Sequence, residues 1–368
     1  MHILYYHQHF ATPRGAAGTR SYEMARRLIE CGHHVTMICG SCAGADTGLQ
    51  GEPVKGIRQG DVEGIHVIEF YLPYSNYDSF MKRVWIFLRF AFQSSIIALT
   101  YDYDLLFATS TPMTAGIPGI VGRFFRRKPF VFEVRDLWPE LPREMGVITN
   151  PLVLKAMDLL EWLSYHCANA CIGLSPGIVD GIKRRGIDSR KVTMIPNGCD
   201  LELFDPEKSK PIRPAGVKET DFVVIFTGAH GIANGLDAVL NAALELKNRG
   251  RKDIKFVFIG DGKLKPELKR RARLGQLENC IFLDPVPKRE LAHLLQGVDA
   301  GLIVLANIPA FYYGTSPNKF FDYIAAGLPV LNNYPGWLSD MITENKCGIV
   351  VPPENPDAFA DALEYLAD

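Results

Sequence analysis

The sequence of 368 residues predicts an α/β protein of two doubly wound, Rossmann-like domains that face each other across a cleft. Two observations predict this fold. Short apolar runs rich in β-branched residues alternate with longer helical patterns. The alternation restarts after a proline-rich, basic stretch, and the length suits two domains because a domain has on the order of 150 residues. We therefore place the first domain at residues 1–205 and the second at residues 206–368.

The strands are expected at runs of apolar residues. In the first domain they are residues 2–6, 34–39, 65–70, 105–108, 130–134, 170–174 and 192–195. In the second they are residues 222–227, 255–259, 281–282, 301–305, 330–331 and 348–351. Helices are expected between them, among others at residues 21–31, 81–99 and 235–248. This order predicts parallel sheets with helices on both faces, in which ligands bind beyond the carboxyl ends of the strands.

The composition excludes several classes of protein. Hydrophobic residues make up 47% and charged residues 22%, which is typical of a globular chain rather than a disordered one. The net charge of −1 provides no global field for nucleic acid, so we expect no nucleic-acid partner. Eight cysteines are too few for a disulfide-stapled scaffold, and no signal-peptide pattern opens the sequence. A cytoplasmic location is the expectation.

The loop at residues 7–20 joins the first strand to the first helix and contains candidate anion-binding residues. Gly15 and Gly18 would let the backbone approach an anion at the helix N-terminus, and Arg14 and Arg20 would add positive charge. The alternative is a glycine-rich connection without a ligand, because the loop lacks the GxGxxG fingerprint. The histidines at the start of this loop fit ordinary polar groups at a strand end better than a metal site.

A second glycine-rich turn follows the first strand of the second domain. It contains Gly228, His230 and Gly231, and a helix follows it. One such turn in each domain favours a phosphorylated ligand more strongly than either turn alone. We therefore predict that these three residues bind a phosphate of such a ligand.

Residues 316–330 form the most informative local pattern. A helix beginning near Pro317 would present Ser316, Asn318 and Lys319 at its N-terminus, where a diphosphate is well accommodated. Asp322 follows on the same helix face and would reach a sugar hydroxyl. All four of these polar residues are predicted to bind a ligand that carries a diphosphate and a sugar.

These motifs together resemble glycosyltransferase family 4, whose members are retaining enzymes of the GT-B fold. Residues 317–330 match Pro-x-Lys-x-x-acidic-Tyr-x-Ala-x-Gly-x-Pro-Val, and residues 132–140, 195–200 and 258–262 support the resemblance. With the opening loop, they resemble the bacterial subgroup that transfers fucosamine-type or other N-acetylamino sugars to lipid-linked O-antigen or capsule precursors. The resemblance covers essentially the whole chain.

The resemblance implies retaining transfer of an N-acetylamino or deoxyamino sugar from a nucleoside diphosphate, with uridine favoured, to a polyprenyl-diphosphate-linked acceptor. It implies no cofactor and no metal. It places Arg135 and Asp136 beside the reacting sugar, where Asp136 would position or deprotonate the acceptor hydroxyl and Arg135 would contact a phosphate. These two residues and Lys319 are the predicted catalytic residues. The resemblance also implies that the first loop binds the acceptor and that the second-domain residues bind the donor. The acceptor residues are Arg14, Gly15, Gly18 and Arg20, and the donor residues are Gly228, His230, Gly231, Ser316, Asn318, Lys319 and Asp322. A buried Arg–Asp pair that fixes the loop is the alternative.

The sequence also departs from the family pattern. The family has two acidic residues separated by seven positions, and here Asp322 occupies the second while Gly314 stands at the first. The usual Arg and Lys near the second-domain turn are missing, with Asn234 near the place of the Lys. Lys319 is then the remaining cation for the diphosphate. The chain ends soon after a helix led by Pro356, so we expect the second domain without the family's final crossover helix.

Residues 81–99 predict a helix that is apolar over most of its circumference, and a basic cluster follows at residues 123–128. A wide apolar face flanked by cations is typical of a helix that lies on anionic lipid. We therefore expect a peripheral protein on the inner face of the bacterial plasma membrane. A core helix with a solvated edge is the alternative.

Two other functions remain open. A sugar-nucleotide 2-epimerase shares the fold and needs neither acceptor nor membrane. A non-catalytic sugar-nucleotide-binding subunit would bind the donor without transferring its sugar.

Overall fold

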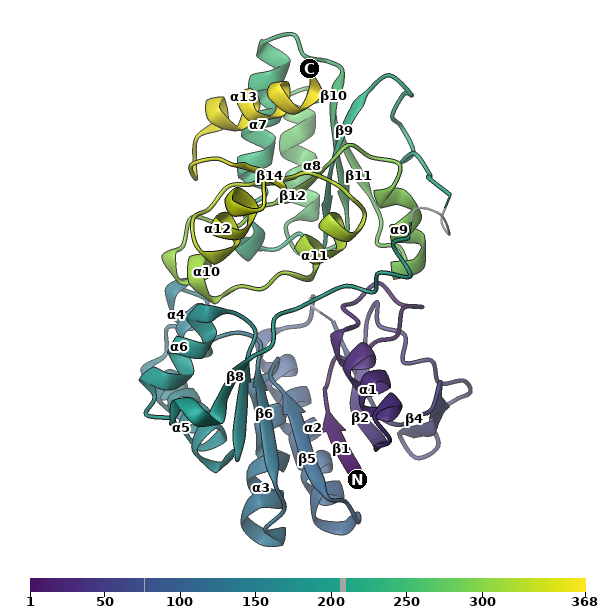
Figure 1. Ribbon diagram of the computed structural model, residues 1–368, viewed down its shortest axis with the longest axis vertical. Coiled ribbons are helices and arrows are strands. Elements are labelled where there is room, and N and C mark those ends of the chain that lie inside the picture. Colours follow the sequence, from purple (N-terminus) through teal and green to yellow (C-terminus); the bar gives the residue numbers. More distant parts are fainter. Residues whose placement is uncertain (76, 206–209) are drawn as a thin grey trace. The chain divides into compact units, whose positions relative to one another are not determined.

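The computed structural model describes residues 1–75, 77–205 and 210–368, which fold as two compact units (Figure 1). Met1–Pro196 and Tyr313–Ser316 form the first unit, and Asn197–Tyr312 and Pro317–Asp368 form the second. Residue 206, at which the sequence predicts the second domain to begin, lies outside the described residues.

The first unit contains an 8-stranded sheet in the order β3-β4-β2-β1-β5-β6-β7-β8. Its strands are β1 (His2–Tyr6), β2 (His34–Cys42), β3 (Ile57–Val62), β4 (Ile65–Tyr74), β5 (Leu105–Thr109), β6 (Phe130–Val134), β7 (Ala170–Gly173) and β8 (Val192–Met194). Its helices are α1 (Arg20–Glu30), α2 (Phe80–Thr100), α3 (Gly116–Arg126), α4 (Glu140–Glu144), α5 (Pro151–Cys167) and α6 (Pro176–Arg184), with the short 3₁₀ helices η1 (Met113–Ala115) and η2 (Ser189–Lys191).

Strand β3 was not expected from the sequence, and it makes this sheet mixed rather than purely parallel. It pairs with β4 in antiparallel orientation, whereas the other neighbouring strands of the sheet are parallel. The two residues between them, Glu63 and Gly64, have φ angles of 51° and 87°. Two consecutive positive φ angles are typical of the tight turn that joins antiparallel strands. The polar, partly exposed sequence of β3 suits an edge strand.

The second unit contains a 6-stranded parallel sheet in the order β11-β10-β9-β12-β13-β14. Its strands are β9 (Phe222–Thr227), β10 (Ile254–Ile259), β11 (Cys280–Leu283), β12 (Ala300–Ile303), β13 (Val330–Asn332) and β14 (Gly348–Val350). Its helices are η3 (Ile232–Asn234), α7 (Asp237–Asn248), α8 (Lys265–Leu274), α9 (Lys288–Leu295), α11 (Asn318–Ala325), α12 (Trp337–Glu344) and α13 (Pro356–Ala367). The helix α10 (Pro309–Gly314) begins in this unit, and its last two residues belong to the first unit. Each strand expected from the sequence is present in the two sheets.

Several helices begin with the same local signal, a capping side chain followed by proline. The side chains of Asn150, Ser175 and Asn355 accept hydrogen bonds from backbone N–H groups in the first turns of α5, α6 and α13. The next residue in each case is proline, which has no N–H to leave unpaired and a φ angle suited to a helix. These helix starts are therefore encoded locally.

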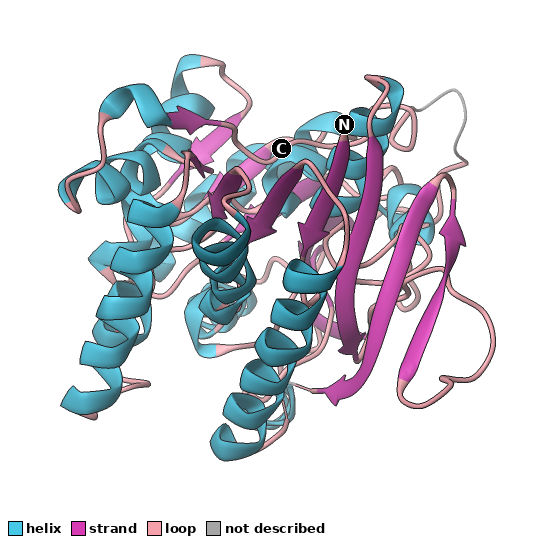
Figure 2. Cartoon of the chain, turned by 90° about the horizontal axis from the view of Figure 1, so that it is seen from below, coloured by secondary structure: helices cyan, strands magenta, loops and turns pink. Residues whose placement is uncertain are grey.

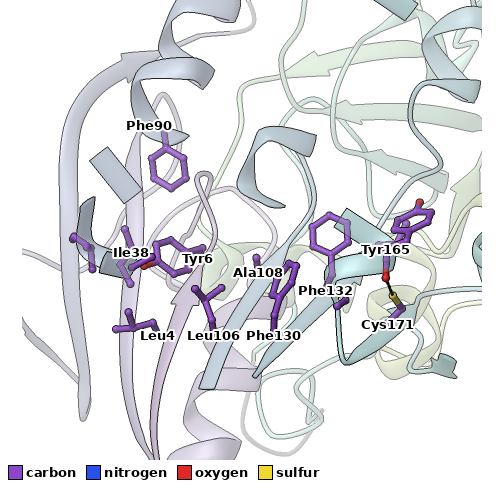
Figure 3. Close-up of a cluster of buried hydrophobic side chains, with 14 of the residues drawn as sticks. Leu4, Tyr6, Ile38, Phe90, Leu106, Ala108, Phe130, Phe132, Tyr165 and Cys171 are labelled. Atoms are coloured by element: carbon purple, nitrogen blue, oxygen red, sulfur yellow. Dashed lines mark hydrogen bonds between the residues drawn. The ribbon is translucent and has the colours of Figure 1, made fainter. Parts of the chain in front are cut away.

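Both faces of the central strands are buried, which explains why these strands are apolar. In the first unit, Leu4 and Tyr6 of β1 pack in one cluster (Figure 3) and Ile3 and Tyr5 in another. The second unit repeats this arrangement with alternate residues of β9 and β10. Figure 2 shows helices packed alongside the strands. The polar residues that follow the strands are thus held on rigid elements.

Candidate functional site

The carboxyl ends of the neighbouring strands β1, β5 and β6 bring polar residues together in the first unit. The backbone N–H of Arg135, directly after β6, donates to Ser110 Oγ at 2.9 Å. Its guanidinium Nη1 lies 3.3 Å from Nε2 of His7, which directly follows β1. Residues from three separate stretches of the sequence therefore line one edge of the sheet, as parallel strand order requires.

Asp136 lies in the same loop and contacts Thr111, whose Oγ1 donates to Asp136 Oδ2 at 3.3 Å. Burial raises the pKa of the Asp136 carboxyl, while the nearby Arg135 charge opposes that rise. A buried carboxyl with a raised pKa beside a cationic side chain is a candidate proton acceptor. Arg135 and Asp136 thus directly follow β6 at the carboxyl edge of the sheet.

His7 and Gln8 are buried polar residues to which the sequence assigned no site. His7 is 3% exposed and Gln8 is 1% exposed. Within residues 1–75, 77–205 and 210–368, His7 Nδ1 and both amide atoms of Gln8 lack hydrogen-bond partners. Burial lowers the pKa of His7, so its imidazole is neutral. Buried polar groups normally have partners, which makes this cluster a candidate ligand site. The only sequence signal was their position directly after a buried strand.

The structure corrects the expectation that Arg20 binds an acceptor. Its guanidinium donates to Glu133 Oε1 at 2.8 and 3.0 Å and to the backbone oxygens of Ile195 and Pro196 at 2.9 and 2.6 Å. The two side chains of this ion pair are 7% and 0% exposed. Because the partners occupy its donors, Arg20 ties α1 to β6 and to the segment after β8.

The other predicted acceptor residues lie around the turn before α1. A Cβ on Gly15 would lie 2.6 Å from the backbone nitrogen of Asp46, so only glycine fits the close packing of these two loops. Arg14 is exposed and lies 4.0 Å from Glu63, and Gly18 is partly buried. Gly15 therefore has a packing role, whereas Arg14 stays accessible to a ligand.

In the second unit, the glycine turn after β9 interlocks with the turn after β10. Gly228 and Gly260 have φ angles of 127° and 148°, and a Cβ on Gly260 would lie 1.9 Å from Gly228 O. The Gly228 N–H donates to Ile259 O at 2.9 Å. Only glycine suits these two positions, and their packing fixes the backbone at the carboxyl ends of both strands.

Lys319 reaches this turn from the first turn of α11. Its Nζ lies 3.8 Å from the centroid of the Phe226 ring and 3.2 Å from Asn234 Oδ1. In the described part of the chain no carboxylate forms an ion pair with it. Burial lowers the pKa of Lys319 to about 7. Its ammonium group thus lies at the glycine turn with only neutral partners.

The start of α11 supports the same site. Pro317 is the N-cap and has no side-chain acceptor for the first turn, in which the Phe320 N–H donates to Pro317 O at 3.2 Å, so the helix presents the positive end of its dipole to an anion. Asn318 opens the helix next to Lys319 and is partly exposed. The structure groups Ser316 with the first unit rather than with these donor residues.

The structure corrects the role expected for His230. Its side chain is 0% exposed and packs near the rings of Phe226, Phe258 and Phe282 rather than at the surface of the turn. Burial, followed by the charge of Lys265, lowers its pKa to about 4. The His230 side chain is therefore buried among these rings, and only the His230 backbone is left at the turn where a ligand is expected. Gly231, beside it, is partly exposed.

Asp322 likewise forms an ion pair with a buried partner, Lys288. Both of its carboxylate oxygens accept from Lys288 Nζ, at 2.7 and 2.9 Å, and its side chain is 5% exposed. It therefore binds α11 to α9 instead of presenting its carboxylate to a sugar hydroxyl. Lys288 gave no signal in the sequence, because its partner lies 34 residues away.

Comparisons with known proteins agree with this two-unit arrangement. The family described as "Glycosyl transferase 4-like domain" matches residues 15–198, and the family "Glycosyl transferases group 1" matches residues 221–368. WbjE of Pseudomonas aeruginosa, a protein described as a probable glycosyltransferase, is 24% identical over 306 residues. That alignment covers 81% of this chain and 75% of WbjE.

Solved structures share the fold. Sucrose-phosphate synthase from Thermosynechococcus elongatus has a TM-score of 0.70 at 15% identity, covering 99% of this chain and 89% of that one. HepE of Anabaena, in complex with UDP, has a TM-score of 0.63 at 16% identity, with the same two coverages. With the two family matches and the two Rossmann-like sheets, these findings show that the chain belongs to the group 1, 4-like glycosyltransferases of the GT-B fold.

Proposed function

We propose that this chain is a retaining glycosyltransferase that moves an N-acetylamino or deoxyamino sugar from a UDP-linked donor to a lipid-linked saccharide in surface polysaccharide synthesis. The observation that carries the donor half of the proposal is the Lys319 ammonium group, which lies at the glycine turn without a carboxylate partner among the described residues. A diphosphate would supply the missing counter-ion.

The donor chemistry follows from this half-site. As the glycosidic bond to the donor breaks, negative charge develops on the departing diphosphate. Lys319 and the positive end of the α11 helix dipole offset that charge without reorganising, which lowers the barrier. We propose that these groups suffice without a metal ion. The UDP bound in the structure of HepE and the likeness to WbjE support the choice of a nucleotide sugar.

The acceptor half-site is proposed at the polar cluster of the first unit. Asp136 would accept a hydrogen bond from the attacking hydroxyl, and Arg135 and His7 would orient the acceptor. The buried amide of Gln8 would gain the partners that it lacks in the described residues. Because Asp136 is assigned to the acceptor hydroxyl, we propose attack of the hydroxyl on the same face that the diphosphate leaves.

We further propose that the first unit binds the inner leaflet of the plasma membrane through α2 and the end of α3. The exposed apolar side chains of α2 recur at helical spacing and form one stripe: Met81, Trp85, Leu88, Phe92, Ile96 and Leu99. The opposite side of α2 packs on the sheet. By length and composition α2 could also cross a membrane, but a third of that stretch is buried inside the unit. Its packing therefore favours a helix that lies in the interface.

The end of α3 extends this surface. Arg126 donates hydrogen bonds to the backbone oxygens of Leu99 and Tyr101, at the end of α2. Phe124 and Phe125, 76% and 67% exposed, stand beside it. Neither α2 nor α3 contains an acidic residue, while both contain cations. Exposed apolar side chains flanked by positive charge suit anionic lipid, and each cation contributes on the order of 1 kcal/mol to the free energy of binding.

Transfer to a polyprenyl-diphosphate saccharide tests the function. The purified chain is incubated with a radiolabelled panel of UDP- and GDP-sugars, with and without the lipid acceptor, and the anomeric configuration of any product is read by NMR. Transfer with retained configuration supports the proposal. Conversion of the sugar nucleotide without acceptor would show an epimerase, and binding without either reaction would show a non-catalytic subunit.

Co-sedimentation with vesicles tests the membrane surface. Wild-type protein should bind vesicles of phosphatidylcholine and phosphatidylglycerol and not those of phosphatidylcholine alone. Trp85→Glu/Phe92→Glu should abolish binding, while Leu274→Glu, a control at an exposed apolar residue of the second unit, should not. Equal binding by the double variant would refute the surface.

A further inference from the structure

Asn234 holds Lys319 in a defined orientation. It ends η3, the short helix after the glycine turn, and its Oδ1 lies 3.2 Å from Lys319 Nζ. The family that the sequence resembles has a lysine near this position, whereas here a neutral amide stands there and Lys319 of α11 supplies the cation. The exchange gives Asn234 a role in the donor site that the sequence alone did not assign.

The orientation of the Asn234 amide is determined by its surroundings. Its Nδ2 donates to Ala229 O at 2.7 Å, and because a carbonyl can only accept, the amide oxygen must point the other way, toward Lys319. The turn itself is rigid. Gly235 has a φ of 52°, a Cβ there would lie 2.7 Å from Ala306 N, and Ala306 N–H donates to Ala233 O. Asn234 is thus a fixed acceptor.

A neutral acceptor differs from a charged one in its effect on Lys319. An aspartate at position 234 would hold the ammonium group and also cancel its charge, whereas a lysine would repel it. Asparagine orients the group and leaves the charge uncompensated. The Phe226 ring face, at 3.8 Å, also attracts a cation without neutralising it. Gly228 presents no side chain that would block the approach of a ligand, with its ideal Cβ position 3.5 Å from Lys319 Nζ.

We propose that Asn234 is a positioning residue that aims the Lys319 ammonium group at the donor diphosphate, and that the diphosphate is its counter-ion, so that nucleotide binding is coupled to proton uptake by Lys319. This inference rests on the proposed function and specifies how the donor site is charged. It also explains how a chain without the family's usual cations at this turn still holds the leaving group.

Few ionisable groups compete with Lys319 for this role. On its own helix, Asp322 is paired with Lys288 of α9. From β9 it faces the uncharged Phe226, and from the turn after β9 it faces His230, whose pKa of about 4 keeps the ring neutral near pH 7. Asp261 of the next turn and Lys265 and Lys269 of α8 act on the pKa of His230, the first raising it and the two lysines lowering it.

The direction of the pH dependence follows from burial. In the free protein, burial lowers the pKa of Lys319 to about 7, so part of the population is neutral near that pH. An anion stabilises the charged form and raises the pKa in the complex. The complex therefore binds more protons than its components, and affinity falls as pH rises above about 7, by at most about tenfold per pH unit for one proton.

Isothermal titration with UDP measures both parts of the proposal. Titrations at pH 7.5 in Hepes and in Tris, which differ in ionisation enthalpy, count the protons taken up on binding. Wild-type protein should take up a fraction of a proton, and its Kd should rise between pH 6.5 and 8.5. Lys319→Met should bind UDP more weakly and should show neither this proton uptake nor this rise of Kd with pH. Because the variant lacks the lysine, it also measures the protons that UDP itself exchanges.

Two substitutions at Asn234 then give opposite signatures. Asn234→Leu removes the acceptor and should weaken UDP binding about 10- to 100-fold, as expected for a hydrogen bond to a charged group, while proton uptake persists. Asn234→Asp gives Lys319 a carboxylate partner, so proton uptake at pH 7.5 should disappear and binding should weaken. Asn234→Ala, a smaller change, replaces Asn234→Leu if that variant does not fold.

The outcomes separate this inference from the proposed function. Wild-type affinity for UDP in Asn234→Leu and Asn234→Asp would overturn the positioning role. The absence of proton uptake in wild-type protein, beyond that of Lys319→Met, would overturn the coupling. If wild-type protein binds neither UDP nor GDP, the proposed function itself fails.

Discussion

The buried pair of Lys288 and Asp322 provides a test of whether Asp322 is structural or contacts a sugar. Lys288→Met would keep most of the side-chain length but leave the Asp322 carboxylate without its cation. The two side chains are only 11% and 5% exposed, so water cannot replace the partner. Removing one partner of a buried pair costs about 3–5 kcal/mol, and we expect a loss of that size in the free energy of unfolding.

The loss should appear as a lower melting temperature that depends on pH. For a unit of this size, about 1 kcal/mol corresponds to roughly 2–4 °C, so the expected shift is about 6–20 °C. Burial already raises the pKa of Asp322, and Lys288 opposes that rise. Without Lys288 the pKa rises further, and protonation at low pH removes the buried charge. The deficit should therefore be largest above pH 7 and shrink toward pH 5.

Calorimetry of wild type and Lys288→Met at pH 5 and pH 8 measures this effect. Arg289→Met, which removes an exposed cation from the same helix, is the matched control and should change stability by less than about 0.5 kcal/mol. Lys288→Met/Asp322→Leu should recover part of the loss, because no charge stays buried. A deficit below about 1 kcal/mol, or an equal deficit at both pH values, would refute the structural role.

Three further predictions concern residues whose roles differ from those expected from the sequence. Arg20→Met should lower the free energy of unfolding by about 3–5 kcal/mol in urea titration, because Glu133 would lose its partner, and a change in acceptor affinity alone would contradict this. Gly260→Ala should cost about 1–3 kcal/mol or more, because a side chain at φ 148° would meet Gly228, and unchanged stability would be inconsistent with the interlocked turns. The wild-type free energy of unfolding should fall as pH decreases from about 6.5 to about 4, because the folded state keeps His230 neutral. His230→Leu should reduce that slope, and identical slopes would argue against it.

Much of this protein is encoded locally and could be predicted from the sequence. The central strands could be found because both of their faces are buried, so that they are continuous apolar runs. The glycine turns after β1 and β9, and the helix that begins beside Pro317, could be found because tight backbone turns and helix starts restrict residue type. These local rules placed Arg135 and Asp136 at the carboxyl end of a strand and Lys319 at the start of a helix, where a ligand site is expected. They missed β3, whose polar sequence follows from its place at the sheet edge.

Only the tertiary structure decided which polar side chains are free to meet a ligand. Arg20 and Glu133 lie 113 residues apart in the chain, and Lys288 and Asp322 lie 34 apart. A charged residue has the same signature in a sequence whether it faces solvent or a buried partner, because the partner is chosen by strand order and helix packing. The same packing places the Asn234 amide, and not a carboxylate, beside Lys319 in the described part of the chain. The charge of the Lys319 ammonium group is therefore not neutralised there.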